Sequence, residues 1–310
     1  MCGRMFLALA AITALCFPER LWAQFTDPRT YTVSPVGVNQ LETDFGYARA
    51  DASIDNSLVI GGAHLKLQQA TVSYSHNFSL LGDLAWVKAS APLARLSGYV
   101  AGTRISGSTS GAGDASLELA TLIKGGQALS AAEFSKYESA TTCGMGVTVT
   151  APTGEYNSNK LLNLGAHRWS IKPEVGISQP FGAERTWVID GYVNTYFFSD
   201  NTSYRGTEVL RQEPLPGLEA HISHDFTPRF WASVDARYAF RGDTLVDGVD
   251  QNSAQRSLTL GSEASWSPRS RHTFELVVAK AVVHKNAPAA TGVAMRYVYN
   301  WCHSDKVTCP

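Results

Sequence analysis

Residues 230–240 have the sequence FWASVDARYAF, and this stretch decides the fold. Every second residue from Phe230 to Phe240 is apolar, whereas the positions between them include Ser233, Asp235 and Arg237. A repeat of two residues is that of a β-strand, whose successive side chains point to opposite faces. The stretch therefore predicts a strand with one apolar face and one largely polar face.

The same alternation recurs along the chain. It is clear in residues 169–178, 218–226, 258–266 and 293–301, and weaker in residues 40–50, 65–78, 83–93, 114–124, 143–151, 185–198 and 271–281. These stretches and residues 230–240 are candidate strands, separated by clusters of Gly, Pro, Asn, Asp and Ser. Several reach about ten residues, which suits a tilted membrane-crossing strand (about nine to eleven) better than an average strand (about five to six).

A secreted β-sandwich or β-helix would also alternate, because one face of its strands meets a core. Three features favour a membrane barrel instead: the long strands, the aromatic residues at strand ends such as Phe240 and Trp301, and apolar faces built from Ala, Val and Leu. Closure into a barrel leaves no sheet edge exposed to lipid. We therefore predict an all-β protein, a transmembrane antiparallel β-barrel of about twelve strands after an N-terminal signal peptide.

The composition excludes several classes of protein. Of the 310 residues 44% are hydrophobic and 17% are charged, a charged share below the roughly 25% of soluble domains. Lys and Arg number 26 against 27 Asp and Glu, so there is no positive surplus for a nucleic-acid partner. After residue 25 no apolar run approaches the roughly 18 residues of a transmembrane helix. Disorder, nucleic-acid binding and a helical membrane protein are not expected.

The N-terminus predicts export. Arg4 precedes a largely apolar stretch, residues 5–17, which suits a secretory signal and is too short to span a bilayer. A cut after Ala23 would divide the chain into a signal peptide (1–23) and an outer-membrane β-barrel (24–310). We expect this barrel to have a short periplasmic N-terminal segment and a C-terminal tail from about residue 302.

Several short motifs have the order and spacing of a known family. They are Gly37-Val38-Asn39-Gln40-Leu41-Glu42 with Phe45-Gly46-Tyr47, Gly111-Ala112-Gly113-Asp114, Ala151-Pro152-Thr153-Gly154, and Asn163-Leu164-Gly165 with Trp169 and Lys172-Pro173. Together they resemble the outer-membrane barrels labelled as transporters of the phenol-degradation MetA-pathway type, along most of the mature chain. The resemblance implies a signal peptide, an antiparallel barrel in the outer membrane of a Gram-negative bacterium, and passage of small, often hydrophobic or aromatic, compounds.

Two features depart from this pattern. Many bacterial barrels end on an aromatic residue that the barrel-assembly machinery reads, whereas here nine residues follow Trp301. We expect Trp301 to act as an internal signal for assembly. A long insert lies between Lys124 and Cys143, and we interpret it as an extracellular loop, with inward folding as the alternative.

The sequence offers little chemistry. Gly111 and Gly113 are followed by neither a third glycine nor a helix, so a nucleotide site is not expected. His221 and His224 are three apart on a strand and point to opposite faces, which excludes a shared metal. His221 and Ser223 share a face, but it is the polar one, so an outer-membrane hydrolase acting on lipid is a weak alternative. We expect no enzyme activity, no cofactor and no metal.

Three cysteines follow the predicted signal peptide: Cys143, Cys302 and Cys309. The oxidising periplasm permits disulfides, and Cys302 and Cys309 are close enough in sequence to close a small loop. The alternative is that all three are free thiols.

The predicted function is an outer-membrane channel for passive uptake of small compounds, hydrophobic or aromatic ones among them; the alternative is a non-conducting structural or receptor-like barrel. Its partners would be outer-membrane lipid, the barrel-assembly machinery and a small-molecule solute. Alternation turns the following charged or titratable residues into the lumen, as selectivity candidates: Lys172, Glu174, Asp190, Glu219, His221, Asp225, Asp235, Arg237, Glu263, Glu275 and Arg296. Alternatively, opposite charges pair across the lumen and fill it.

Overall fold

The computed structural model describes residues 26–52, 62–160 and 162–302. The predicted signal peptide, Cys309 and most of the predicted tail lie outside these residues. Within the described part of the chain, no helix is both long and apolar enough to cross a membrane.

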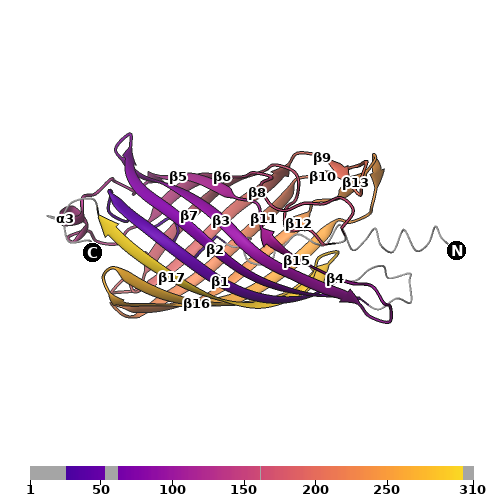
Figure 1. Cartoon of the computed structure of the whole chain (residues 1–310). Helices are drawn as coiled ribbons and strands as arrows, with labels where there is room; N and C mark the ends of the chain where they lie inside the picture. Colours follow the sequence, from indigo (N-terminus) through magenta and orange to yellow (C-terminus); the bar gives the residue numbers. More distant parts are fainter. Residues whose placement is uncertain (1–25, 53–61, 161, 303–310) are drawn as a thin grey trace.

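Twelve antiparallel strands form a closed barrel (Figure 1). They are β1 (Val38–Ala52), β2 (Ala63–Leu80), β3 (Asp83–Val100), β5 (Ser116–Lys124), β6 (Thr142–Thr150), β7 (Ser170–Phe181), β8 (Trp187–Phe198), β11 (Leu215–Thr227), β12 (Phe230–Arg241), β15 (Gln255–Arg269), β16 (His272–Lys285) and β17 (Ala289–Cys302). Strand β1 pairs with both β2 and β17, so the first and last strands close the sheet. Each predicted strand corresponds to one of these twelve, which confirms the predicted fold class.

Several short elements were not predicted. Strand β3 is longer than expected: its first half pairs with β5, and its second half pairs with β4 (Ser106–Ala112). A small separate sheet contains β9 (Asn201–Tyr204), β10 (Glu208–Gln212), β13 (Thr244–Val246) and β14 (Val249–Asp250). A single helical turn, α3 (Ala131–Phe134), lies between β5 and β6. Residue alternation does not reveal these elements, because β4 consists of small residues with no polar and apolar alternation and each of the others has only two to five residues.

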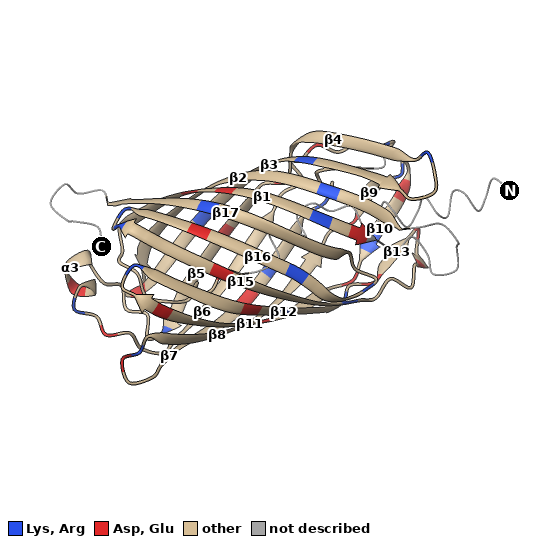
Figure 2. Ribbon diagram, turned by 90° about the horizontal axis from the view of Figure 1, so that it is seen from below, with Lys and Arg blue, Asp and Glu red and all other residues tan. Residues whose placement is uncertain are grey.

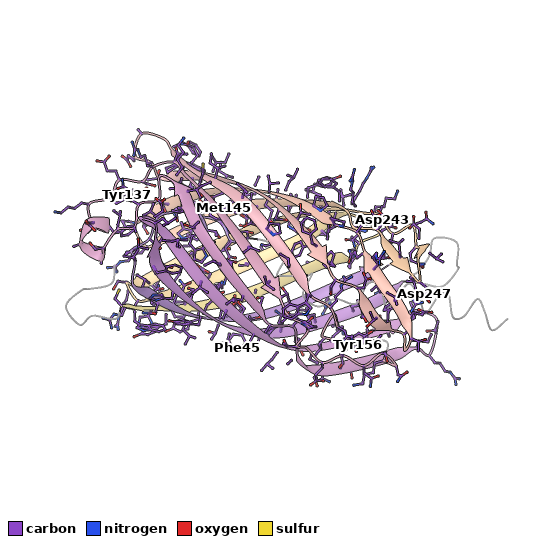
Figure 3. The ribbon with its side chains drawn as sticks, turned by 90° about the horizontal axis from the view of Figure 1, so that it is seen from above. Phe45, Tyr137, Met145, Tyr156, Asp243 and Asp247 are labelled. Carbon is purple, nitrogen blue, oxygen red and sulfur yellow. The ribbon has the colours of Figure 1, made fainter. Side chains whose placement is uncertain are left out.

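The two ends of the barrel differ in the length of their loops. Strands β2–β3, β11–β12 and β15–β16 are joined by tight turns at one end, which we call the short-turn end. The small sheet lies at the opposite, long-loop end, where Figure 3 labels Tyr156, Asp243 and Asp247. Outer-membrane barrels have short periplasmic turns and long extracellular loops. The long-loop end is therefore the extracellular one.

The insert between Lys124 and Cys143 lies at the short-turn end, with α3 and Tyr137 (Figures 1 and 3). The expectation of an extracellular loop was wrong. The insert is held there because the Leu129 carbonyl accepts the Val36 N–H at 2.9 Å. Leu129, Phe134 and Tyr137 also pack against an apolar cluster inside the barrel.

The outer face of the barrel is apolar. Val234 is 63% exposed, whereas its neighbour Asp235 on the inner face is only 6% exposed. Phe45 and Met145, labelled in Figure 3, are likewise exposed on the wall. This is the arrangement of a barrel in lipid, with apolar side chains outward and polar ones in the lumen.

The two described cysteines differ in state. Cys143 is a free thiol, whereas Cys302, at the end of β17, is disulfide-bonded. Its pairing with Cys309 stays a prediction, because Cys309 lies outside the described residues.

Candidate functional site in the barrel lumen

The lumen contains the start of the described chain. We expected a periplasmic N-terminal segment, but residues 26–37, here called the N-terminal segment, lie inside the barrel. The Thr26 N–H donates to Glu219 at 2.8 Å, and the Thr26 hydroxyl donates to Glu174 at 2.5 Å. Both glutamates are buried on the inner faces of β11 and β7. The segment stays inside because wall carboxylates accept its N–H and hydroxyl groups.

Tyr31 is the main anchor of this segment. Its hydroxyl donates to Glu174 at 3.0 Å, and its carbonyl accepts the Thr142 hydroxyl. Its ring lies over Gly144 and Gly176, where an added Cβ would be 2.1 and 2.3 Å from ring atoms. Two glycines on neighbouring strands therefore create the space that the ring fills.

Arg29 ties the segment to the same side of the barrel. Its Nε donates to Ser223 at 2.8 Å, its Nη1 to Asp225 at 2.7 Å, and its backbone N–H to Asp190 at 3.1 Å. The guanidinium also lies 4.8 Å from the ring centroid of Trp231. Strands β7, β8, β11 and β12 thus form one surface, the segment-binding wall.

The eleven candidates predicted from the sequence all lie inside the barrel, but in two different settings. Glu174, Asp190, Glu219 and Asp225 hold the N-terminal segment. Arg237 donates to Glu219 at 3.2 Å and is buried in the same wall. The other six line an open cavity: Lys172, His221, Asp235, Glu263, Glu275 and Arg296. Their role in selectivity stays a prediction.

His221 and Ser223, the residues of the hydrolase alternative, have polar partners inside the barrel. His221 Nδ1 lies 2.8 Å from Asp235 Oδ1, and the Ser223 hydroxyl accepts from Arg29. Both residues are buried in the interior, away from the lipid-facing surface.

The cavity lies beside the N-terminal segment and has a volume of about 720 Å³. The side facing the segment is formed by β15, β16, β17, β1, β2 and β3, here called the cavity wall. Strand β2 contributes Gln69, Thr71, Ser73, Ser75 and Asn77, all from its inner face. This part of the cavity is therefore lined by hydroxyl and amide groups.

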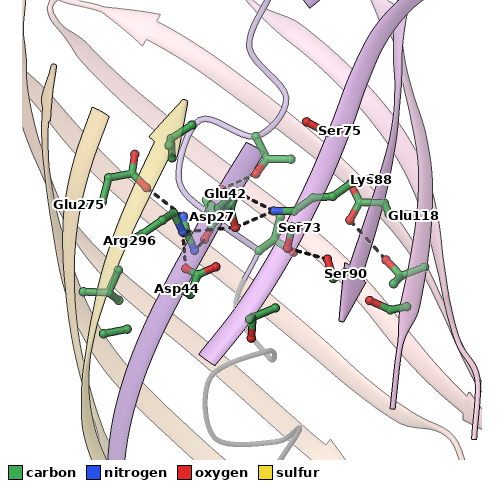
Figure 4. Close-up of a pocket in the computed structure, with 18 of the residues that line it drawn as sticks. Asp27, Glu42, Asp44, Ser73, Ser75, Lys88, Ser90, Glu118, Glu275 and Arg296 are labelled. Carbon is green, nitrogen blue, oxygen red and sulfur yellow. Dashed lines mark hydrogen bonds and ion pairs between the residues drawn. The ribbon is translucent and has the colours of Figure 1, made fainter. Parts of the chain in front are cut away.

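A cluster of charges crosses the cavity wall (Figure 4). Arg296 donates to Asp44 at 2.7 Å and to Glu275 and Asp27 at 3.0 Å each. Lys88 donates to both oxygens of Glu42 at 3.0 Å. Because Asp27 belongs to the N-terminal segment, this cluster also connects the segment to the cavity wall.

Sequence reasoning missed four members of this cluster: Asp27, Glu42, Asp44 and Lys88. The signal for three of them was available, because residues 42 and 44 share the inner face of β1, and residue 88 lies on that of β3. Asp27 had no such signal, because it lies before the first strand.

The cavity lining is negatively charged. It includes eight Asp or Glu residues and four Lys or Arg residues. Figure 2 shows acidic and basic residues on neighbouring strands midway along the barrel. The lining therefore has a surplus of four acidic over basic residues.

Three of the short motifs named in the sequence analysis meet at the long-loop end. Asp114 accepts the N–H groups of Gly154 and Ala166, each at 2.7 Å. A Cβ on Gly154 would lie 2.7 Å from the Gly113 carbonyl carbon, and one on Gly165 would lie 2.7 Å from the Gly154 oxygen. The three motifs thus form one clamp around Asp114, which fixes the loop between β6 and β7.

Comparisons with known proteins agree with this architecture. The family described as "Putative MetA-pathway of phenol degradation" matches residues 47–297. An outer membrane channel from Pseudomonas putida F1 has a TM-score of 0.77 at 20% identity, covering 89% of this chain and 100% of that one. The transport unit of the Escherichia coli autotransporter AIDA-I has a TM-score of 0.51 at 8% identity, covering 94% and 96%. No match was found among curated proteins.

Both solved structures confirm the fold of an outer-membrane barrel. With the apolar outer face described above, this fold places the barrel in the bacterial outer membrane.

Proposed function

The chain belongs to the phenol-degradation MetA-pathway family, and we propose that it is a channel of the outer membrane. Small compounds, hydrophobic or aromatic ones among them, cross it by passive diffusion. The observation that carries this proposal is the cavity, whose lining runs from Val38 and Asn77 near the short-turn end to Ala94 and Leu164 near the long-loop end.

The size of the cavity restricts the solute. A twelve-stranded barrel is narrower than the sixteen-stranded porins, which have open aqueous channels. Here the N-terminal segment occupies part of the lumen, so the remaining space suits small molecules. The Ser73 and Ser90 hydroxyls, 2.9 Å apart on the cavity wall, offer hydrogen bonds to a solute hydroxyl.

The cavity wall also separates solutes by charge. Its surplus of carboxylates repels anions, because a narrow interior strengthens the interaction between like charges. Uncharged phenols are therefore better substrates than aromatic carboxylates. The lumen side chains act in this proposal by hydrogen bonding and electrostatics, without a catalytic step.

A second candidate function is a non-conducting barrel. The observation that favours it is the pairing of charges inside the segment-binding wall, where Lys172 lies 3.3 Å from Glu174 and Arg237 lies 3.2 Å from Glu219. Together with the bound N-terminal segment, these pairs fill one side of the lumen.

Conductance in a planar lipid bilayer separates the two candidates. Purified protein, first shown to be folded by its heat-modifiable gel mobility, is added to a bilayer under voltage. Steady unitary currents support the channel. Silence from folded protein supports the non-conducting barrel. Heat-denatured protein from the same preparation is the control for contaminating porins.

We further propose that the barrel-assembly machinery reads Trp301. This residue lies near the end of β17 with its ring 5.8 Å from that of Tyr299 and 6.0 Å from that of Tyr74. Deletion of the residues after Trp301 should leave assembly intact, whereas a deletion that includes Trp301 should abolish it. Equal amounts of folded barrel from the two deletions would contradict this role.

A further inference from the structure

The inner face of the cavity wall changes character along its length. On β2 the inward residues are polar midway along the barrel, for example Ser73 and Ser75, but they become Leu67, Leu65 and Ala63 toward the long-loop end. The lumen of an outer-membrane barrel is normally polar. An apolar stretch of inner wall therefore needs an apolar partner other than lipid.

The two strands beside β2 change in the same way. On β1 the inward residues pass from Glu42 and Asp44 to Ala48 and Ala50. On β3 they pass from Lys88 and Ser90 to Leu96 and Val100. Three neighbouring strands thus present one continuous apolar surface, here called the apolar inner wall, formed by Ala48, Ala50, Leu65, Leu67, Leu96 and Val100.

Leu162 and Leu164 cover this surface in the structure. They are 5% and 1% exposed and belong to the same packed cluster as the apolar inner wall. Both come from the loop that Asp114 clamps, and Leu164 is fixed because its N–H donates to the Glu155 carbonyl at 3.2 Å. Leu162, two residues before Leu164, takes no part in this hydrogen bond, and its side chain faces Gly107 of β4.

The covered surface is continuous with the cavity. Leu164 and Ala94 contact the apolar inner wall and also line the cavity. A solute leaving the apolar surface therefore arrives directly at the hydroxyl groups and charges of the cavity wall. An apolar surface followed by a polar one matches a molecule that has a ring and a hydroxyl group.

We propose that the apolar inner wall is a binding subsite for the ring of a small uncharged aromatic solute, and that Leu162 holds this place when no solute is bound. The solute binds by displacing the Leu162 side chain, while the Asp114 clamp keeps the base of the loop in position. The choice of an aromatic solute rests on the proposed function, but the subsite itself rests on the packing described above.

The test measures displacement of residue 162 without measuring transport. Leu162→Cys is made in a Cys143→Ser background, and the protein is reconstituted in lipid vesicles. Its alkylation by N-ethylmaleimide is followed by mass spectrometry of the peptide that carries residue 162. We expect slow alkylation without solute and a several-fold faster rate with phenol. Benzoate, which is aromatic but anionic, and glycerol, which lacks a ring, should not raise the rate.

Two controls isolate the effect. Asn159→Cys, exposed in the same loop, should react at one rate with and without phenol, which excludes a general effect of phenol on the bilayer or the reagent. Leu67→Asn, added to the Leu162→Cys protein, should bring the ratio of rates with and without phenol close to one. Leu122→Asn, which changes a buried leucine of the other apolar cluster, should leave that ratio unchanged.

A rate at residue 162 that phenol does not change, or that glycerol raises equally, would overturn the subsite. Fast alkylation without any solute would also overturn it, because Leu162 would then not be docked. The bilayer currents are a separate measurement. A silent barrel whose residue 162 still responds to phenol would reject the channel and keep the subsite, and a conducting barrel without the response would do the reverse.

Discussion

The segment-binding wall and the cavity wall are built from the same kind of strand, yet their charges have different surroundings. On the segment-binding wall, Glu174 and Glu219 accept hydrogen bonds from Thr26, a fixed part of the chain. On the cavity wall, Glu275 and Arg296 pair with each other beside open space. These glutamates of the segment-binding wall therefore hold protein, whereas the charges of the cavity wall face open space, although Arg296 also contacts Asp27 of the segment.

This difference shows that an inward-facing charged residue on a barrel strand can have more than one structural role. Its role depends on whether another part of the chain covers it. Thr26 is separated from Glu219 by 193 residues, so the strand pattern around Glu219 carries no information about this contact. The same alternation thus produces a structural carboxylate on β11 and a cavity-lining one on β16.

The largest expected effect comes from placing a charge on the lipid-facing side of a barrel strand. The roles of both walls depend on which side of each strand faces the lumen. Val234→Arg places a charge on the lipid-facing side of β12, near the bilayer midplane, at a cost of about 2 to 4 kcal/mol. We expect a large loss of folded protein, measured as the heat-modifiable fraction in outer membranes. Val234→Leu is the matched control and should fold normally. Equal yields from the two variants would contradict the assignment of the faces.

The next largest effect should follow from releasing the N-terminal segment. Tyr31→Ala removes the anchor from its glycine-lined space, and deleting a buried aromatic side chain costs about 3 to 5 kcal/mol. If the segment leaves the lumen, the cavity widens, and the unitary conductance in a planar bilayer should rise several-fold. An unchanged conductance would mean that the segment does not limit the path.

A glycine pair provides an independent version of this experiment. Gly176→Ala puts a methyl group 2.3 Å from the Tyr31 ring and should raise conductance in the same direction. Gly191→Ala, on the adjacent strand, meets its nearest atom at 3.6 Å and should behave as the wild type. A conductance increase from both changes would point to a general loosening of the barrel instead.

The strands could be predicted from the sequence because side chains that face lipid must be apolar, so every second residue of a barrel strand is apolar. The alternation around Val234 records this rule directly, and it recurs in all twelve barrel strands. The position of the N-terminal segment could not be predicted in this way. Its residues have no repeat, and the hydrogen-bond partners of the Arg29 and Tyr31 side chains lie more than a hundred residues away, as with Tyr31 and Glu174.

The motifs show a different limit. Gly113, Gly154 and Gly165 belong to motifs that were visible in the sequence, but the sequence did not show that they meet. Their actual role is mutual close approach around Asp114, which requires the fold to bring the β4–β5 loop and two parts of the β6–β7 loop together. The insert before Cys143 was misplaced for a related reason: its length suggested the extracellular side, whereas its apolar residues decided its position.

A smaller effect is expected from the carboxylates of the cavity wall. Glu263→Gln with Glu275→Gln replaces two carboxyl groups of the cavity lining by amides. The reversal potential in a salt gradient should move toward the value for an unselective pore, because fewer fixed charges attract cations. Asp190→Asn with Asp225→Asn makes the same change on the segment-binding wall and should move the reversal potential less. Equal shifts from the two pairs would remove the distinction between the walls.

The smallest expected effect separates two arginines that alternation alone treats as equivalent. Arg296 lines the cavity, whereas Arg237 is buried in the segment-binding wall and donates to Glu219. Arg296→Gln removes one positive charge from the path, so the reversal potential should move toward the cation value. This shift should be smaller than that of the double change above and opposite in direction.

Arg237→Gln should leave the reversal potential of conducting molecules unchanged and lower the folded fraction, because the buried Glu219 loses its charged partner. Measuring folded fraction and reversal potential on the same preparations keeps the two effects apart. A shift from Arg237→Gln as large as that from Arg296→Gln would mean that the solute path also reaches the part of the segment-binding wall under the N-terminal segment, and that the segment does not cover this part during conduction.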